Sequence, residues 1–273
     1  MPELPEIETI MRGLAPHLEN TIIQDVIVRY PQLRWPIPPN LNRSLNGKQI
    51  IGLSRRGKYL LIHVTAGALI THLGMSGSLR ILNQATSPTS HDHMDIILSN
   101  HTILRYNDPR RFGAILWTEE NPLHHPLLKS MGVEPLDAHF TGQYLKQLTL
   151  KRRTPIKSFI MNSKIIAGIG NIYAAEALFL AKIHPTTQAY LLTEQQCNQL
   201  VASIKKILEF AISKGGTTLK DFVNSEGKPG YFSQQLNVYG RAGKPCMVCH
   251  SPLQLMQLGQ RSTVFCKQCQ PLP

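Results

Sequence analysis

The stretch CMVCHSPLQLMQLGQRSTVFCKQC, residues 246–269, decides the fold at the C-terminal end of this chain. Two Cys-x-x-Cys pairs, Cys246 with Cys249 and Cys266 with Cys269, are separated by 16 residues. This spacing is typical of zinc held between two knuckles on a β-hairpin. Structural disulfides are the alternative, but paired Cys-x-x-Cys motifs in a cytosolic chain favour a metal. The sequence therefore predicts a Zn²⁺ site formed by these four cysteines.

Upstream of this module the hydrophobic pattern is helical from Thr154 onward. In TEQQCNQLVASIKKILEFAISKGG (193–216), Thr193 and Gln196 match a capping box, and Gly215 supplies a stop signal. One apolar stripe runs along this helix, and it includes the fifth cysteine as a core residue: Cys197, Leu200, Val201, Ile204 and Leu208. The run NSEGKPGYFSQQLNVYGRAGK (224–244) then predicts a loop that leads into the zinc module.

The first 130 residues are expected to form mostly strands after one opening helix. Apolar residues at helical spacing mark that helix: Ile7, Ile10, Met11, Leu14 and Leu18. Short β-branched runs separated by turn residues mark strands, as in TIIQDVIVRY, KYLLIHV, ALITHLG, MDIILS and TILRY. The pattern predicts a sandwich or a barrel, followed by the Pro-rich irregular stretch 121–137.

Composition narrows the class of partner. The chain has 273 residues, with 29 Lys and Arg against 17 Asp and Glu, so its formal net charge is +12. Such a charge favours a polyanionic partner, with nucleic acid ranked ahead of an anionic membrane surface. The charge alone does not decide whether the protein binds DNA. No stretch approaches the roughly 20 apolar residues of a transmembrane helix, and the N-terminus lacks the apolar core of a secretory signal. We expect a soluble cytoplasmic protein without membrane partners.

Several short motifs have both a structural and a functional interpretation. In GIGNIYAAEALF (168–179), two glycines precede Asn171 at an expected helix N-cap, which is either an ordinary cap or a phosphate site that Lys157 could complete. Lys58, in RRGKYLL, lies either in a solvated basic turn or over a site. Met75 lies in a turn between Gly74 and Ser76, and Phe112 follows two arginines in NDPRRFG (107–113). Such a Met and Phe fit either surface turns or a wedge between stacked bases.

The N-terminal sequence MPELPEIETI raises the same choice. Pro2 is either the start of the first helix or, if Met1 is removed, a free secondary amine beside Glu3.

Taken in order, these motifs resemble bacterial formamidopyrimidine-DNA glycosylases. The resemblance runs from residue 2 to residue 270 and follows the glycosylase branch rather than the endonuclease VIII branch. It rests on MPELPEIET, RRGKYLL, HLGMSGSLR, HDHMDI, DPRRFGA, GIGNIYAAEALF, GGTTLKDF, GKPGYF, NVYGR and the terminal QRSTVFCKQCQ with its Cys-x-x-Cys pairs.

The resemblance implies a bifunctional DNA glycosylase and AP lyase of base excision repair. It would excise oxidised purines such as 8-oxoguanine and formamidopyrimidines from double-stranded DNA, and then cleave the strand by β,δ-elimination. Pro2, freed of Met1, would attack C1′ and form a Schiff base. Glu3 would act as general acid and base with Glu6 in support, and Lys58 would assist base release and elimination.

Other residues take their expected roles from the same resemblance. Met75, Arg110 and Phe112 would fill the gap left by the everted nucleotide, with Arg110 facing the orphaned cytosine. Four residues would hold phosphates around that nucleotide: His91, Lys157, Asn171 and Arg261. Arg261, at the tip of the zinc hairpin, is counted with the catalytic residues Pro2, Glu3 and Lys58. Further residues of the groove are expected to be Glu176, Lys220, Tyr239 and Arg241. The loop around NSEGKPGYF would close over the everted base.

The fold implied is a multidomain α+β protein with one structural zinc, since four thiolates leave no open position for catalysis. Its expected parts are an N-terminal helix with a catalytic β-sandwich domain (1–130), a linker (131–153), a helix-two-turn-helix domain with the lesion-recognition loop (154–235), and a zinc-finger domain on a β-hairpin (236–273). We expect a monomer. Two alternatives remain: a damage-binding protein without catalysis, and an RNA-binding zinc-ribbon protein.

Overall fold

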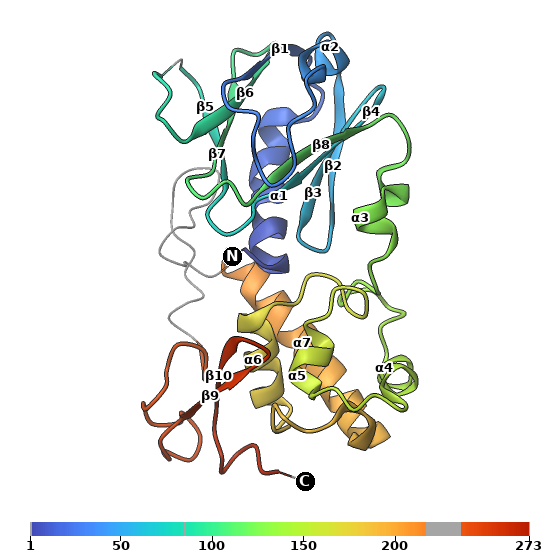
Figure 1. The fold of residues 1–273 in the computed structure, drawn as a ribbon, viewed down its shortest axis with the longest axis vertical. Helices are drawn as coiled ribbons and strands as arrows, with labels where there is room; N and C mark the ends of the chain where they lie inside the picture. Colours follow the sequence, from blue (N-terminus) through green and yellow to red (C-terminus); the bar gives the residue numbers. More distant parts are fainter. Residues whose placement is uncertain (1, 85, 217–235, 273) are drawn as a thin grey trace. The chain divides into compact units, whose positions relative to one another are not determined.

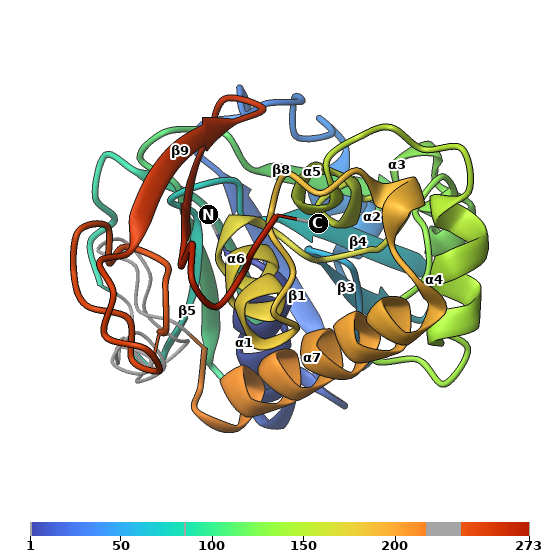
Figure 2. The ribbon, with the colours of Figure 1, turned by 90° about the horizontal axis from the view of Figure 1, so that it is seen from below.

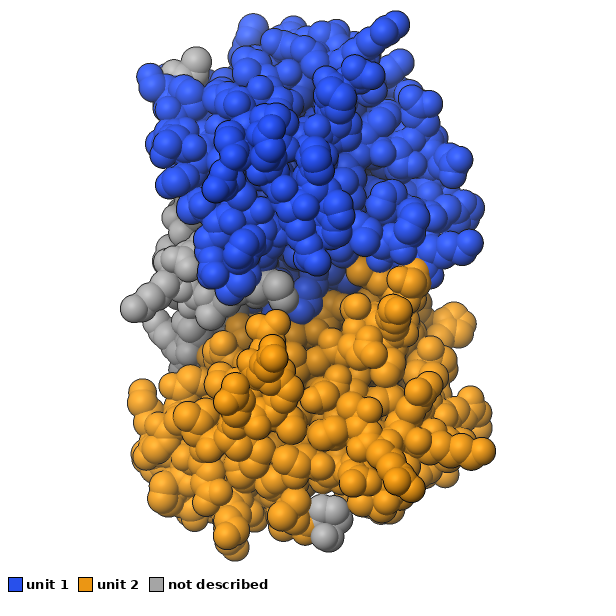
Figure 3. All heavy atoms as spheres, viewed as in Figure 1, with its two compact units in different colours: residues 1–129, 214–233 blue, residues 130–213, 234–273 orange. Residues whose placement is uncertain are grey.

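The computed structural model describes residues 2–84, 86–216 and 236–272, and the chain divides into two compact units (Figures 1 and 3). Unit 1 comprises residues 1–129 and 214–233, and unit 2 comprises 130–213 and 234–273. None of the described helices is long and apolar enough to cross a membrane. The division into four parts made from the sequence stays a prediction.

The described residues of unit 1 form two antiparallel four-stranded sheets, so this unit is a sandwich and not a barrel. One sheet has the order β2-β3-β4-β8, formed by Ile50–Arg56, Tyr59–Val64, Gly67–His72 and Ala114–Thr118. The other has the order β1-β6-β7-β5, formed by Ile23–Val28, Asp92–Leu98, Ile103–Asn107 and Ser78–Leu82. The short helices of this unit are α2 (Leu41–Leu45), η1 (Pro122–His124) and α3 (Pro126–Lys129).

Helix α1 (Leu4–Leu18) shares its apolar face with both sheets (Figure 1). Ile7, Ile10 and Leu14 belong to the same buried cluster as Leu60 of one sheet and Met94 of the other. Burying several such side chains stabilises the fold by about 1.5–3 kcal/mol each. The core therefore fixes the helix, and with it the N-terminal residues, relative to the strands.

Two neighbouring loops connect one sheet to the other. Residues 73–77 join β4 to β5, and residues 108–113 join β7 to β8. Because His72 pairs with Ala114 and Ser78 pairs with Asn107, both ends of the two loops are held by strand pairing. The topology therefore presents these loops side by side.

The helices of unit 2 pack on a long central helix. That helix is α7 (Glu194–Ser213), and α4 (Gly142–Thr149) and α6 (Asn171–Leu180) lie against it (Figure 2). The unit also holds α5 (Ile156–Ile160) and η2 (Ala189–Leu191). The predicted apolar stripe of α7 is buried throughout, and its capping box is confirmed, since Gln196 N donates to Thr193 Oγ1 at 3.2 Å and Thr193 N donates to Gln196 Oε1 at 2.9 Å. Helix α4 lies within the stretch that the sequence assigns to a linker.

The C-terminal hairpin consists of β9 (Gln254–Leu258) and β10 (Arg261–Phe265). Leu258 pairs with Arg261 across the two-residue turn Gly259–Gln260, in which both residues have positive φ. Positive φ at both positions defines a type I′ turn, whose twist matches that of the strands. Residues of the hairpin and of the cysteine knuckles share a small core with Ala175 and Phe179 of α6.

Candidate functional site

The start of α1 buries two carboxylates beside Pro2. Glu3 is the N-cap residue, and its backbone N–H donates to Glu6 Oε2 at 2.8 Å. Glu3 is 3% exposed and Glu6 is fully buried. Pro2 precedes the cap and Pro5 lies in the first turn, so Pro5 has the helix-starting role that one interpretation gave to Pro2. Glu6 is therefore a capping residue, whereas Pro2 and Glu3 lie together just outside the helix.

The segment after α7 returns to this helix start. Gly216 has φ +79°, and a Cβ at this position would lie 3.1 Å from Glu6 Oε1. Only a residue without a side chain allows so close an approach at that φ. Gly216, the second residue of the motif GGTTLKDF, thus lies against Glu6 at the end of α1 that carries Glu3.

Lys58 lies in the tight turn between β2 and β3. Arg56 pairs with Tyr59, which leaves Gly57 (φ +58°) and Lys58 as the turn residues. Arg55 braces the turn, because it donates to the Gly57 carbonyl at 3.0 Å and to Glu8 of α1 at 3.0 Å. The helix that begins next to Glu3 therefore also holds the turn that carries Lys58.

Met75, Arg110 and Phe112 project from the two neighbouring crossover loops. Met75 is 39% exposed and Phe112 is 47% exposed. The Arg110 guanidinium lies over the Phe112 ring, with Cζ 5.0 Å from its centroid. The structure thus brings together the three residues to which the resemblance gives the role of a wedge.

His72 supports the Met75 turn as a neutral imidazole. Its Nδ1 accepts the Gly74 N–H at 3.0 Å, and its ring packs on Tyr59 with centroids 4.7 Å apart. Burial, and next the positive charges of Lys58 and Arg34, lower the pKa of His72 from 6.5 to about 4. An acceptor at Nδ1 requires the unprotonated form, so the hydrogen bond and the lowered pKa agree.

This lowered pKa predicts a pH-dependent stability. His72 binds a proton below about pH 6.5 in the unfolded chain but only near pH 4 in the folded chain. The free energy of unfolding therefore decreases as the pH is lowered from about 6.5 to about 4, and it levels off below pH 4. A shift of this size corresponds to about 3 kcal/mol. When the pH is lowered from 7 to 4, we expect the free energy of unfolding to decrease by this amount more in wild type than in His72→Asn. The Asn amide oxygen can also accept the Gly74 N–H, so the variant keeps this hydrogen bond without a titrating group.

Urea unfolding at several pH values between 7 and 4 measures this difference. Burial also lowers the pKa values of His63 and His184. Both residues are present in wild type and in His72→Asn, so their contributions to the pH dependence cancel in the comparison. Asp92 and Asp95 have lowered pKa values and titrate below this window. Parallel curves for wild type and His72→Asn would contradict the prediction.

His91 opens onto a cavity of about 220 Å³ lined by Tyr30, Ser90, His91, His93, Pro109 and Arg111. The Arg111 side chain donates to the Tyr30 hydroxyl and lies over its ring, with Cζ 5.0 Å from the centroid. The buried His93 donates through Nε2 to the Asp108 carbonyl at 2.8 Å, while its Nδ1 has no partner among the described residues. A pocket with a guanidinium and imidazole nitrogens suits an anion.

In unit 2, Lys157 and Asn171 form one hydrogen-bonded group with the zinc hairpin. Lys157 is 1% exposed, and its Nζ donates to Asn171 Oδ1 at 2.6 Å, to Thr263 Oγ1 at 2.7 Å and to the Ser262 carbonyl at 3.2 Å. Asn171 Nδ2 donates to the same carbonyl at 3.1 Å. Asn171 is the first helical residue of α6 and Gly170 is its N-cap, so the expected N-cap position of Asn171 is wrong.

Glu176 holds the segment that enters the zinc module. Its fully buried carboxylate accepts backbone N–H groups of Asn237, Val238 and Tyr239 at 2.8–2.9 Å, and also Asn237 Nδ2 at 2.9 Å. Arg241 donates to the carbonyls of Asn237 and Pro245. Glu176 and Arg241 therefore shape the chain around Tyr239.

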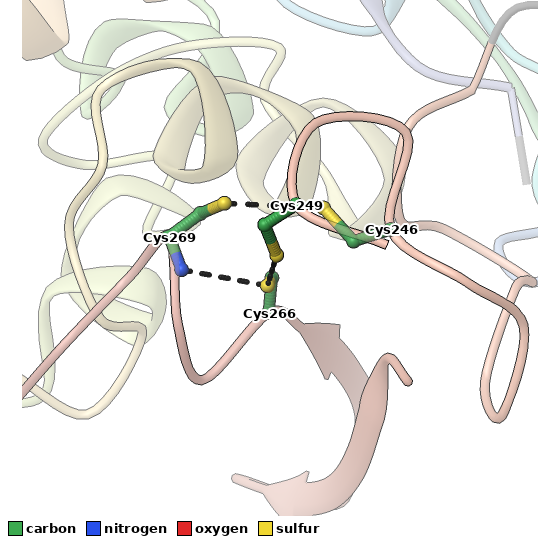
Figure 4. A group of neighbouring side chains, drawn as sticks. All are labelled: Cys246, Cys249, Cys266 and Cys269. Atoms are coloured by element: carbon green, nitrogen blue, oxygen red, sulfur yellow. Dashed lines mark hydrogen bonds between the residues drawn. The ribbon is translucent and has the colours of Figure 1, made fainter. Parts of the chain in front are cut away.

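The four predicted metal ligands converge (Figure 4). Their sulfurs all lie within 4.8 Å of one another, with Cys249 and Cys266 3.4 Å apart and Cys246 and Cys269 3.9 Å apart. Zn–S bonds of about 2.3 Å in a tetrahedron place sulfurs about 3.8 Å apart. A disulfide needs about 2.05 Å, so these distances fit a zinc-binding site and not paired disulfides.

Some residues of the site could not be named from the sequence, and others lie outside the described part. Asp108 belongs to the quoted motif DPRRFGA, yet an Asp before Pro in a turn is ordinary turn chemistry and gives no separate signal. Lys220 and the loop NSEGKPGYF lie outside the described residues. Arg261 is exposed at the tip of the hairpin, as predicted.

Three family models match the chain. They are the formamidopyrimidine-DNA glycosylase N-terminal domain over residues 1–115, the formamidopyrimidine-DNA glycosylase H2TH domain over 131–223, and the zinc finger found in FPG and IleRS over 243–272.

Whole proteins and solved structures are similar over the full length. Formamidopyrimidine-DNA glycosylase of Nitrosococcus oceani is 53% identical over 270 residues, 99% of this chain and 100% of the relative, and that of Legionella pneumophila is 52% identical over 272 residues, 100% and 99%. The MutM (FPG) protein of Thermus thermophilus has a TM-score of 0.89 at 33% identity over 100% of both chains. Wild-type Lactococcus lactis Fpg (MutM), in a complex with N7-benzyl-Fapy-dG containing DNA, has a TM-score of 0.91 at 33% identity over 99% and 100%.

Proposed function

This chain belongs to the formamidopyrimidine-DNA glycosylase family, and from that premise we propose which residues carry out the reaction. The protein is a bifunctional DNA glycosylase and AP lyase of base excision repair. It excises oxidised purines such as 8-oxoguanine and formamidopyrimidines from double-stranded DNA and cleaves the strand at the resulting abasic site. The roles of individual residues below are our proposals.

Pro2 is the nucleophile once Met1 is removed. Its secondary amine attacks C1′ of the damaged nucleotide, the bond from C1′ to the base breaks, and the base leaves with a proton. The bond from C1′ to the ring oxygen O4′ then breaks and O4′ takes a proton, so that C1′ and the Pro2 nitrogen form an iminium. This iminium has no N–H proton to lose and so remains a cation. This cation acidifies the neighbouring carbon of the sugar, so that β-elimination and then δ-elimination expel the flanking phosphates.

Glu3 is the general acid and base at the sugar. It adjoins Pro2 in the chain, and burial to 3% exposure keeps its carboxyl out of bulk water. Lys58 assists base release and elimination from the turn that Glu8 and Arg55 brace against α1. The shared helix supports the idea that these groups act on one sugar.

Met75, Arg110 and Phe112 fill the space left by the everted nucleotide. A base must leave the stack before Pro2 can reach C1′, and exposed apolar side chains replace its stacking. The exposure of Met75 and Phe112 on adjoining loops supports this role. Arg110 would then face the orphaned cytosine.

The remaining polar residues hold the DNA backbone. In unit 1, His91 and Arg111 offer an anion pocket, and we assign a phosphate to it. In unit 2, Asn171 and the exposed Arg261 contact phosphates, with Tyr239 nearby in the sequence motif. Lys157 is too buried for direct contact and instead orients Asn171 against the hairpin, so its charge acts from beneath the surface.

One Zn²⁺ bound by Cys246, Cys249, Cys266 and Cys269 has a structural role. Four thiolates fill a tetrahedral site, so no position is left for water or substrate. When bound, the ion joins the two knuckles and stabilises the hairpin that carries Arg261. We further propose that the protein acts in the cytoplasm as a monomer.

The observation that carries this function is the full-length family match combined with Pro2 and Glu3 at the start of α1. We expect borohydride to trap a covalent adduct on duplex DNA with 8-oxoguanine opposite cytosine, with the DNA on the peptide that begins at Pro2. The measurement is mass spectrometry of the crosslinked peptide, with an undamaged duplex as control. Tight binding of damaged DNA without an adduct, in protein shown to lack Met1, would favour a non-catalytic damage-binding protein instead.

A further inference from the structure

Asp108 is the first residue of the loop 108–113, which carries Phe112, and its carboxylate contacts both this loop and the loop 73–77, which carries Met75. Asp108 is fully buried, and its Oδ1 accepts from Ser76 Oγ at 2.9 Å. Its Oδ2 accepts the Gly113 N–H at 2.8 Å and the Tyr106 hydroxyl at 3.2 Å. Ser76 follows Met75 in the chain and Gly113 follows Phe112, so each carboxylate oxygen holds one of the two loops.

The two loops also contact each other through backbone. A Cβ on Gly74 would lie 2.5 Å from the Phe112 carbonyl carbon and 2.6 Å from Gly113 N. The Arg110 N–H donates to Ser76 Oγ at 3.3 Å, which adds a bond between the loops. With so little space between them, a shift of one loop must move the other.

A carboxylate is the side chain that this arrangement requires. It accepts at both oxygens, whereas an Asn amide accepts at one and donates at the other. Burying a carboxylate is costly unless several donors compensate it. No salt bridge to Asp108 is found in the described part of the chain, so its three hydrogen bonds to the loops and to β7 provide that compensation.

We propose that Asp108 is a positioning residue that couples the Met75 loop to the Arg110–Phe112 loop, so that the three side chains enter DNA as one rigid unit. The inference rests on the proposed wedge role of those side chains. Coupling affects the step in which a stacked, paired base is displaced, because a loose wedge fills the gap less effectively. Elimination at a sugar that has already lost its base needs no such displacement.

The test compares two substrates for Asp108→Asn. The single-turnover rate of 8-oxoguanine excision opposite cytosine is expected to fall by about 10- to 100-fold, which is the size of effect that a small misplacement of the reacting groups produces. Strand cleavage of the same duplex with a preformed abasic site is expected to change less than about 3-fold, since Pro2, Glu3 and Lys58 are unaltered. Equal losses on both substrates, or no loss on either, would overturn the proposal. Failure of wild type to cleave either substrate would instead overturn the proposed function.

Two further variants separate coupling from general destabilisation. In a Phe112→Ala background, Asp108→Asn is expected to slow excision by less than about 3-fold more, because the wedge it positions is already removed. Asp95→Asn is the matched control, since Asp95 is also buried (3% exposed) but bonds only to Arg29 and Arg105 among the described residues. Below its melting temperature it should retain both activities. Full additivity of Asp108→Asn with Phe112→Ala would contradict the coupling.

A milder variant covers the case in which Asp108→Asn fails to fold. Ser76→Ala removes one of the three bonds to the carboxylate and leaves the other two. It is expected to lower 8-oxoguanine excision more than abasic-site cleavage, by a smaller ratio than Asp108→Asn. An unchanged ratio of the two rates in soluble Ser76→Ala would overturn the proposal.

Discussion

Protein that retains Met1 is expected to lose both base excision and strand cleavage by on the order of 10⁴-fold or more. With Met1 in place the Pro2 nitrogen is an amide, whose lone pair is delocalised into the carbonyl and cannot attack C1′. Single-turnover cleavage of 8-oxoguanine duplex measures the loss. Cell-free synthesis with methionine aminopeptidase inhibited provides this form.

The same sample supplies its own control. Treatment with methionine aminopeptidase removes Met1, and cleavage should return in proportion to the fraction of chains whose intact mass lacks one methionine. Affinity for an undamaged duplex should stay within about 3-fold, because no residue proposed to contact phosphates is changed. Full activity with Met1 retained would contradict the prediction and would direct attention to Lys58 as the amine, which trapping would then locate on the peptide containing it.

Local sequence patterns predicted the elements whose signals are self-contained. The opening helix, five strands of the sandwich and α7 with its cap follow from periodicity and turn residues over short windows. Strands β2, β5 and β8 were not singled out. β2 ends in two arginines and pairs with β3 across a two-residue turn, whereas β5 directly follows a glycine-containing turn and pairs with β7, and β8 pairs with β4. Pairing over long separations is a tertiary effect that β propensity does not encode.

The same distinction separates the parts of the site. The four cysteines could be predicted because ligand chemistry and spacing suffice to define a zinc knuckle. Glycine at an N-cap is acceptable as well, and this is why Gly170 and not Asn171 caps α6. Lys157 reaches Thr263, 106 residues away, and Asp108 reaches Ser76, 32 residues away. Bonds over such separations depend on the assembled fold, so the supporting roles of Lys157 and Asp108 appear only in the structure.

Loss of zinc is expected to weaken DNA binding by at least about 100-fold. The hairpin and its knuckles share a small apolar core with α6, and the four sulfurs converge between the knuckles, so the metal supplies much of the folding free energy of this module. Without it, Arg261 loses its fixed position and Lys157 and Asn171 lose their acceptors at Ser262 and Thr263. Loss of the zinc would thus disrupt phosphate contacts both on the hairpin and on α6.

Cys249→Ser tests this, with Cys197→Ser as the matched control. Cys249 is one of the four converging sulfurs, whereas Cys197 is fully buried in α7 away from that group. Cys249→Ser should release its zinc to a chromogenic chelator and bind a duplex with a tetrahydrofuran abasic analogue at least about 100-fold more weakly in fluorescence anisotropy, while far-UV circular dichroism keeps the signal of the β-sandwich. Cys197→Ser should keep one zinc per chain and near wild-type affinity. Undiminished binding by zinc-free Cys249→Ser would mean that the phosphate contacts of unit 2 form without the ion.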